Sequence, residues 1–209
     1  SQINLVTGLD SPWLFGIVLA ALTGLVIFGG LRSIARVTSW LVPFMCALYI
    51  IASLIIILSH YADIPQAIAT IVTGAFAPDG VVGGIIGVFV IGMRRAVYST
   101  ESGLGSATMA HAAAKTNEPV SEGMIALFEP FIDTIVVSTM TALVIVITGA
   151  YQLDGLQDIR MTSAAYGSVF SWFPYILAVI VFLFAFSTII SWGYYISKVW
   201  EYLFGNSLL

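Results

Sequence analysis

The hydrophobic pattern of this 209-residue chain consists of long apolar segments separated by short polar stretches. Each long segment approaches the ~20 residues that an α-helix needs to cross the hydrocarbon core of a bilayer. The pattern therefore predicts membrane-spanning helices that begin and end at residues 12–30, 40–59, 81–97, 124–150 and 172–196. A shorter apolar run at residues 66–77 lies between two prolines, which predicts a short helix on the membrane surface.

The third apolar segment continues into a run of small residues and glycines, STESGLGSA, at residues 99–107. An alanine-rich stretch with high helix propensity follows at residues 106–115. We therefore expect one discontinuous helix over residues 81–115, interrupted at the glycines. The alternative is that residues 81–97 span the membrane alone and residues 106–115 lie on the cytoplasmic surface.

The composition indicates the class of protein. Hydrophobic residues make up 59% of the chain and charged residues only 9%, whereas soluble domains carry ~25% charged residues. The chain is predicted to be an all-α polytopic membrane protein, with residues 1–209 in a single membrane domain. No basic run indicates a nucleic-acid partner. Because the chain begins at Ser1 and ends just after an apolar segment, we expect a piece of a longer protein. Its partners are then the lipid bilayer and the missing flanking helices of the same protein.

The basic residues predict the orientation. Four bases fall on one side if the spans simply alternate, and by the positive-inside rule that side faces the cytoplasm of a cell inner (plasma) membrane; these are Arg32, Arg36, Lys115 and Lys198. Arg94 and Arg95 fit less well because they precede the glycine run, at or near membrane depth. Either they pair with acids inside the helix bundle, or residues 81–97 span alone.

The glycine run is a candidate binding site. Glycine permits backbone conformations that free N–H and C=O groups from the helix ladder. Freed N–H groups suit a carboxylate and freed carbonyls suit a sodium ion, which is how secondary transporters build sites near the bilayer midplane. The residues whose backbone such a break would free are Ser102, Gly103, Leu104 and Gly105. The alternative is that small residues here let two helices pack closely.

Three acids lie in or beside apolar sequence. Glu101 is in the glycine run, while Glu129 and Asp133 are four residues apart on one helix face. A cation site or gate would explain the pair, and so would a structural ion network with Arg94, Arg95 or Lys115. We favour the network for Glu129 and weigh both explanations equally for Asp133. Nearby hydroxyls in residues 134–141 are expected to bond their own backbone or a neighbouring helix more often than a ligand.

The last apolar segment carries a third group of polar residues. Thr188 and Trp192 are four residues apart and share a helix face, where a hydroxyl and an indole could hold a small zwitterion. Ser187 lies ~100° round the helix and could offer oxygen to Na⁺. The alternative is an ordinary interfacial aromatic with ordinary hydroxyls.

Four stretches together resemble the sodium:alanine (glycine) symporter family. They are RRAVYSTESGLGSATMAHAAAKTNEPV at residues 94–120, FEPFIDTIVVSTMTALVIVITG at 128–149, GGLRSIARVTSWLVPFMCALYI at 29–50 and FAFSTIISWGYYISKVWEYLFG at 184–205. The resemblance covers nearly the whole chain. It implies a LeuT-type fold of two five-helix inverted repeats, of which this chain resembles helices 4 to 8 with a broken helix 6.

The resemblance also implies roles for residues. The glycine run and the pair Thr188 and Trp192 resemble substrate-contacting positions, Ser187 and Thr188 resemble a second sodium site, and Asp133 loosely resembles a sodium-site position on helix 7. The chain departs from the family pattern at Ala96, Thr100, Ser102 and Thr108, where the family usually has Gly, Asn, Ala and Pro. These departures leave the fine substrate preference and the exact position of the helix break open.

The expected function is sodium-coupled symport of a small neutral amino acid, alanine or glycine, by alternating access. An uncoupled channel or facilitator and a proton-coupled amino-acid transporter are the alternatives. An intramembrane enzyme is disfavoured because the chain has no H-E-x-x-H zinc pattern. His111, the histidine nearest the acids, is expected to be a packing or interfacial residue.

Overall fold

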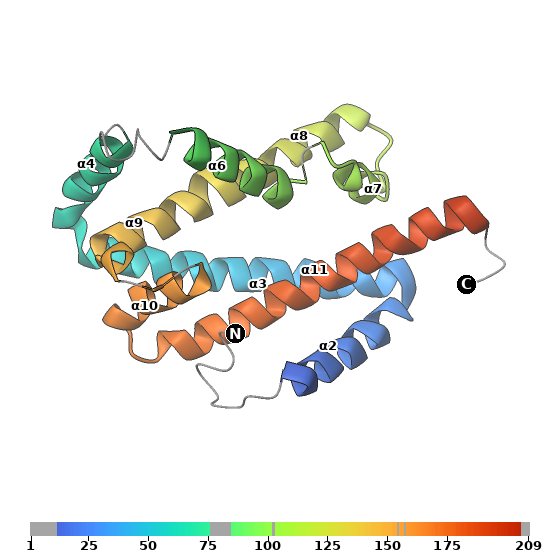
Figure 1. Ribbon diagram of the computed structural model, residues 1–209. Coiled ribbons are helices and arrows are strands. Elements are labelled where there is room, and N and C mark those ends of the chain that lie inside the picture. Colours follow the sequence, from blue (N-terminus) through green and yellow to red (C-terminus); the bar gives the residue numbers. More distant parts are fainter. Residues whose placement is uncertain (1–11, 76–84, 102, 154, 157, 206–209) are drawn as a thin grey trace. The chain divides into compact units, whose positions relative to one another are not determined.

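The computed structural model describes residues 12–75, 85–101, 103–153, 155–156 and 158–205 (Figure 1). The regular structure of these residues is entirely helical, as the composition predicts. The chain divides into two compact units. The first contains Ser1–Ala52 and Gln157–Leu209, and the second contains Ser53–Leu156.

The first unit begins with α2 (Pro12–Ile27) and α3 (Gly30–Ser59), which continues into the second unit. The turn between them is short: the Phe28 N–H donates to the Gly24 carbonyl at 2.9 Å, and Gly30 adopts a φ of +67° that favours glycine. The prediction that this helix starts at residue 40 is wrong. Arg32 and Arg36 lie in the first turns of α3, because nothing between Gly30 and residue 40 breaks a helix and arginine is a good helix former.

The core of the first unit lies between α2, the start of α3 and α11 (Phe173–Phe204). Ile34, Phe186 and Ile190 are buried there, and apolar residues of α2 and α3 pack against them. The approach of α2 to α11 is close: a Cβ added to Gly193 would lie 2.5 Å from the Ile27 Cδ1 atom. Glycine at this position therefore allows the two helices to run side by side (Figure 1).

A helix that the hydrophobic pattern did not predict, α10 (Ile159–Val169), precedes α11. Its Tyr166 is fully buried and stacks on Phe173 with ring centroids 4.6 Å apart. Tyr166 also meets the Tyr49 ring of α3 at 5.6 Å. This aromatic cluster holds α10 against the beginning of α11.

Helix α11 extends beyond the predicted end at residue 196 and includes Lys198. The Lys198 Nζ atom lies 2.7 Å from a Glu201 carboxylate oxygen, and the Trp200 and Phe204 rings lie 4.4 Å apart. These contacts favour one more helical stretch. The helix ends at Gly205, whose φ of +74° breaks the ladder.

The second unit contains three consecutive helical segments without interruption: α8 (Pro119–Pro130), the π-helical segment η2 (Phe131–Ser138) and α9 (Thr139–Ile147). The helix therefore begins earlier than the predicted residue 124, with Pro119 in its first turn, where a missing N–H costs nothing. A π-helical segment directly after Pro130 has a physical cause, because proline has no N–H to continue the α-helical ladder.

Shorter helices complete the second unit. A 3₁₀ turn, η1 (Tyr61–Asp63), leads into α4 (Ile64–Ala75), which packs against α9. Then come α6 (Ile85–Ser99) and α7 (Ser106–His111), and η3 (Ala150–Gln152) follows α9. The predicted surface helix at residues 66–77 corresponds to α4 as far as residue 75, and its last two residues lie outside the described part.

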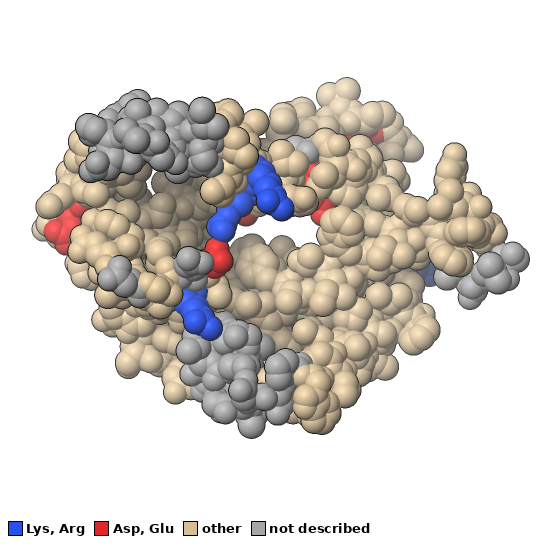
Figure 2. Space-filling view, in the orientation of Figure 1, with Lys and Arg blue, Asp and Glu red and all other residues tan. Residues whose placement is uncertain are grey.

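The described helices are long and apolar enough to cross a membrane in three places: Arg32–Ser59, Pro119–Ile147 and Phe173–Phe204. Helix α2 has 16 residues and reaches roughly 24 Å at 1.5 Å per residue, less than the predicted span at 12–30. Figure 2 shows a face on which charged side chains are few. The structure is therefore that of a polytopic helical membrane protein.

Candidate functional site

The glycine run interrupts a helix, because α6 ends at Ser99 and α7 begins at Ser106. Three residues between them have positive φ angles: Glu101 at +53°, Gly103 at +79° and Gly105 at +83°. The glycines adopt this conformation readily, whereas Glu101 is strained in it. Ser102, which we had placed in the site, lies outside the described residues.

The second half of the interrupted helix is shorter than predicted. Helix α7 ends at His111 and not at residue 115. After Ala112, the N–H groups of Ala113 and Ala114 bond back three residues to Ala110 and His111 at 3.1 and 3.0 Å. The helix thus tightens and stops despite its alanines, since local propensity is a weak constraint beside tertiary contacts.

The hydrogen bonds around the interruption leave one buried group without a partner. Thr100 and Thr108 donate their hydroxyls to the carbonyls of Ala96 and Gly105, at 2.9 and 2.6 Å. Ser106 is 4% exposed, and its hydroxyl has no hydrogen-bond partner in the described part of the chain. A buried polar group without a partner is costly, so this hydroxyl marks a place that a bound group can satisfy.

The glycine run that the sequence singles out includes Ser106, but the sequence pattern predicts no role for its hydroxyl. Ser106 is the first helical residue after Gly105, so its position after the glycines was the available signal. Leu104, also assigned to the site, is 46% exposed, and its N–H donates to the Glu101 carbonyl at 3.2 Å.

Asp133 lies in the π-helical segment η2 and contacts the interrupted helix. The Ser99 hydroxyl, on the last residue of α6, donates to Asp133 Oδ2. The Ser138 hydroxyl donates to the Asp133 carbonyl at 2.9 Å, as the sequence led us to expect of hydroxyls in this helix. π-Helical turns inside α-helices are frequent at functional sites.

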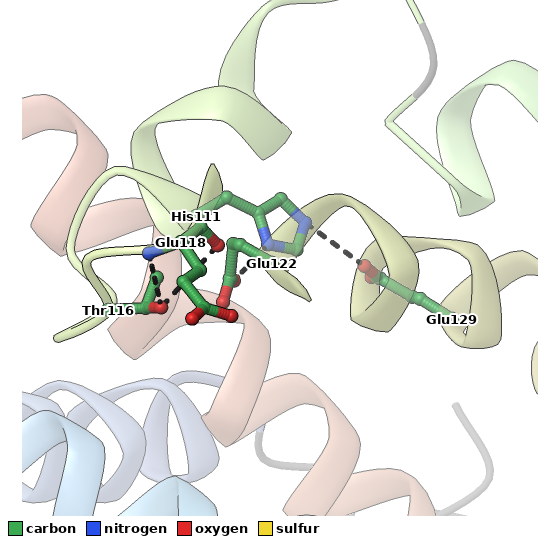
Figure 3. Close-up of polar contacts among 5 residues, drawn as sticks. All are labelled: His111, Thr116, Glu118, Glu122 and Glu129. Atoms are coloured by element: carbon green, nitrogen blue, oxygen red, sulfur yellow. Dashed lines mark hydrogen bonds and ion pairs between the residues drawn. The ribbon is translucent and has the colours of Figure 1, made fainter. Parts of the chain in front are cut away.

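Glu129 has a different partner from the predicted arginine or lysine. Its Oε2 atom lies 3.9 Å from the Nε2 atom of His111, and His111 Nδ1 lies 2.8 Å from Glu122 Oε1 (Figure 3). Glu129 thus lies near a histidine, and the ion network with Arg94, Arg95 or Lys115 stays a prediction. His111 is consequently more than the packing residue that the sequence suggested.

The arginines and the lysine that we expected to pair with Glu129 or Asp133 lie in other surroundings. The Arg94 guanidinium lies 5.9 Å from the centre of the Tyr98 ring, one turn further along α6, which is a cation–π arrangement. Arg94 and Arg95 are both exposed on α6, and Lys115 is exposed in the loop after α7.

In the first unit, α11 presents the other predicted residues on different faces. Ser187 is 6% exposed, and its hydroxyl donates to the Phe184 carbonyl at 3.0 Å. Thr188 is exposed, and Trp192 is 44% exposed with its ring edge-on to Tyr195 at 5.8 Å. Thr188 and Trp192 thus share an open face, while Ser187 points towards the core.

The whole chain, residues 1–209, matches the model of a family described as the sodium:alanine symporter family. This chain belongs to the sodium:alanine symporter family. The resemblance seen in the sequence is therefore confirmed. This is a family of transporters and not of enzymes, which agrees with the prediction of no enzymatic activity.

Among named relatives, "Sodium/alanine symporter AgcS" of Methanococcus maripaludis is 40% identical over 95% of this chain and 44% of its own length. "Probable sodium/glutamine symporter GlnT" of Bacillus subtilis is 39% identical over 82% of this chain and 36% of its own length. "Sodium/proton-dependent alanine carrier protein" of a Bacillus species is 33% identical over 83% of this chain and 42% of its own length. This member of the sodium:alanine symporter family thus spans less than half the length of these curated relatives.

Proposed function

We propose that this chain is part of a sodium-coupled symporter that carries a small neutral amino acid across the plasma membrane by alternating access. The observation that carries the proposal is the interrupted helix. Three positive φ angles, at Glu101, Gly103 and Gly105, precede the buried, unpartnered hydroxyl of Ser106. A helix interrupted inside a membrane protein requires a cavity or a bound group to satisfy its backbone.

The proposed fold is a partial LeuT-type inverted repeat. In it α2 is helix 4, α3 is helix 5, α6 with α7 is the broken helix 6, α8 through α9 is helix 7, and α11 is helix 8. The remaining helices, including the broken helix 1, belong to the part of the protein beyond this chain. Family membership and the relatives' greater length support this assignment.

The proposed substrate contacts belong to the interruption and to α11. The residues of the interruption, from Ser102 to Gly105, hold the amino acid's polar end together with Ser106. Thr188 and Trp192, on the open face of α11, are the other proposed substrate contacts. The proposed amino acid is alanine or glycine; one relative is named a probable sodium/glutamine symporter, so the named substrates differ within the family.

The proposed ion is Na⁺, which is a substrate of the transporter and not a resident cofactor. Hydroxyl and carboxylate oxygens suit a hard cation, and Ser187, Thr188 and Asp133 offer them. Ser187 must turn its hydroxyl away from the Phe184 carbonyl to bind an ion, or offer it as an acceptor while donating. Two relatives are named as sodium/proton-dependent carriers, so proton coupling is the second candidate.

The proposed orientation places Arg32, Arg36, Lys115 and Lys198 on the cytoplasmic side. Sodium would enter from the opposite side and favour the state that also binds the amino acid. Each ligand then raises the affinity of the other, because coupling is reciprocal.

The test is flux in proteoliposomes that contain the complete protein. We expect an inward Na⁺ gradient to drive alanine uptake, and alanine to stimulate Na⁺ uptake. Ser106→Ala should weaken alanine binding about tenfold, the effect of losing one hydrogen bond of about 1.4 kcal/mol. Ser168→Ala is the matched control, since the Ser168 hydroxyl already donates to the Ala165 carbonyl at 2.8 Å. Sodium flux that alanine does not stimulate would support a channel and contradict the proposal.

A further inference from the structure

His111 stands between two carboxylates at the end of α7. Its Nδ1 atom lies 2.8 Å from Glu122 Oε1, and its Nε2 atom lies 3.9 Å from Glu129 Oε2. Glu122 and Glu129 are seven residues apart, so they lie two turns apart on one face of α8. Figure 3 shows the imidazole ring reaching between them from α7.

The two distances assign different roles to the two ring nitrogens. The Glu122 contact has hydrogen-bond length, and a carboxylate only accepts, so Nδ1 carries a hydrogen. In a neutral ring, Nε2 then presents a lone pair to the Glu129 carboxylate, which lies too far away for a hydrogen bond. A second proton on Nε2 turns that nitrogen into a donor, and the positively charged ring is then attracted to the Glu129 carboxylate.

Other charged groups of this region are Glu118, Lys115, Arg94 and Asp133. Glu118, before α8, accepts a hydrogen bond from the Ser121 hydroxyl at 3.2 Å. Its backbone N–H donates to the Thr116 hydroxyl oxygen at 3.1 Å (Figure 3). Lys115 is exposed in the intervening loop. On the α6 side of the interruption, Arg94 lies over Tyr98, and Asp133 of η2 accepts from Ser99.

An open groove of about 480 Å³ runs along this contact. Its lining includes Thr108 and His111 of α7 and Glu122 and Gly123 of α8. The side chains of His111 and Glu122 are 29% and 21% exposed, and that of Glu129 is 60% exposed. Protons can therefore pass between the groove and the imidazole ring in both directions.

We propose that His111 is a positioning residue that holds α7 to α8 more firmly when it binds a second proton, so that transport across the interrupted helix depends on pH. The inference rests on the proposed function. Helix α7 has only six residues, so the His111 contact at its end fixes the orientation of Ser106 at its start. The proton binds to Nε2 and leaves again as pH rises, and no covalent bond changes. Histidine is the side chain whose charge ordinarily changes between about pH 5 and pH 8.

The first experiment measures Na⁺-driven alanine uptake by the complete protein as a function of pH. In the unmodified protein, the apparent KM should fall about fivefold or more from about pH 8 to about pH 5, as the better-held state becomes populated. His111→Asn keeps a donor near the Nδ1 position but cannot take the second proton, so its KM should not change with pH. Glu129→Gln should reduce the change, and the control Glu118→Gln should keep it. An unaltered pH profile in His111→Asn overturns the inference.

The second experiment reports on the contact without transport. Leu104→Cys places a thiol on the exposed Leu104 position, in a background where Cys46 and any other cysteine of the complete protein are replaced by serine. Its maleimide labelling rate is measured at each pH and divided by the rate of the same cysteine variant that also carries His111→Asn. We expect this ratio of labelling rates to fall about threefold or more on acidification. A falling ratio, with no Na⁺-driven uptake by the protein that keeps Leu104, supports the contact and refutes the proposed function. A constant ratio, with normal uptake by the protein that keeps Leu104, overturns the contact alone. If His111→Asn does not fold, Glu129→Gln takes its place in both experiments, and an unchanged pH response in it is equally decisive.

Discussion

Replacing Gly105 by alanine tests whether substrate binding needs the left-handed backbone conformation that the structure has at this position. Gly105 has a φ of +83°, a left-handed conformation that costs an L-residue ~1–2 kcal/mol. A Cβ atom at Gly105 would meet nothing within 4 Å, so the cost is confined to the backbone and no clash contributes. A free-energy difference of this size changes a population ratio about 5- to 30-fold.

We expect the apparent affinity of the complete protein for its amino acid to fall by about the same factor in Gly105→Ala. The reason is that affinity is reduced by the fraction of molecules in the binding-competent state. The measurement is substrate binding or uptake at saturating Na⁺. Gly105→Asn should recover part of the loss, because asparagine tolerates left-handed backbone better than alanine does.

The chain offers a matched control in Gly123. This glycine lies within α8, and a Cβ there also meets nothing within 4 Å, but its φ is not positive. Gly123→Ala should therefore leave binding unchanged and raise helix stability by ~0.5–1 kcal/mol. Equal effects of the two substitutions would refute the argument that the left-handed conformation at Gly105 supports binding.

Three further predictions concern the ion site and the fold. Ser187→Ala or Thr188→Ala should abolish the Na⁺ dependence of uptake in the complete protein, and unchanged coupling would refute the assignment of α11 to the ion site. If the Asp133 carboxylate binds sodium, Asp133→Asn should raise the Na⁺ concentration for half-maximal uptake about tenfold, which is ~1.4 kcal/mol. An unchanged concentration would mean that the carboxylate only accepts the hydrogen bond from Ser99 at the end of α6. Tyr166→Ala should destabilise the protein by ~3–5 kcal/mol through loss of the buried ring, measured as thermal unfolding in detergent. Tyr175→Ala, at a position 60% exposed, is its control, and equal effects would contradict the packing described for α10.

The parts of the fold that the sequence predicts well depend on local chemistry. The interruption follows from two glycines in an apolar stretch, and the structure has positive φ angles at both Gly103 and Gly105. The beginning of α8 could have been placed from Pro119, which is typical of a first helical turn. Its predicted start came later because the prediction followed the apolar residues only. An early start of α3 was missed in the same way.

The parts that the sequence did not predict depend on contacts between distant residues. Helix α10 is short and mixes apolar with polar residues, and Tyr166 stabilises it by packing on aromatic rings of α3 and α11. Ser99 and Asp133 are 34 residues apart, and His111 and Glu122 are 11 apart. No periodicity relates the members of either pair, because each pair joins two different helices. The partner of Glu129 was therefore sought among the arginines and lysines, where charge alone suggested it.

These two long-range contacts have a joint consequence. Both halves of the interrupted helix are bound to one continuous helical path, α6 through Ser99 to Asp133 and α7 through His111 to Glu122. Pro130 and the start of the π-helical segment lie between the two points of attachment. A π-helical turn that reverts to α-helix changes the helical phase of everything beyond it. A change in η2 would therefore move α6 relative to α7 and open or close the glycine run between them, without any change within either half. In the proposed symporter, an ion at Asp133 would therefore bind beside the segment that connects the two halves of the interrupted helix.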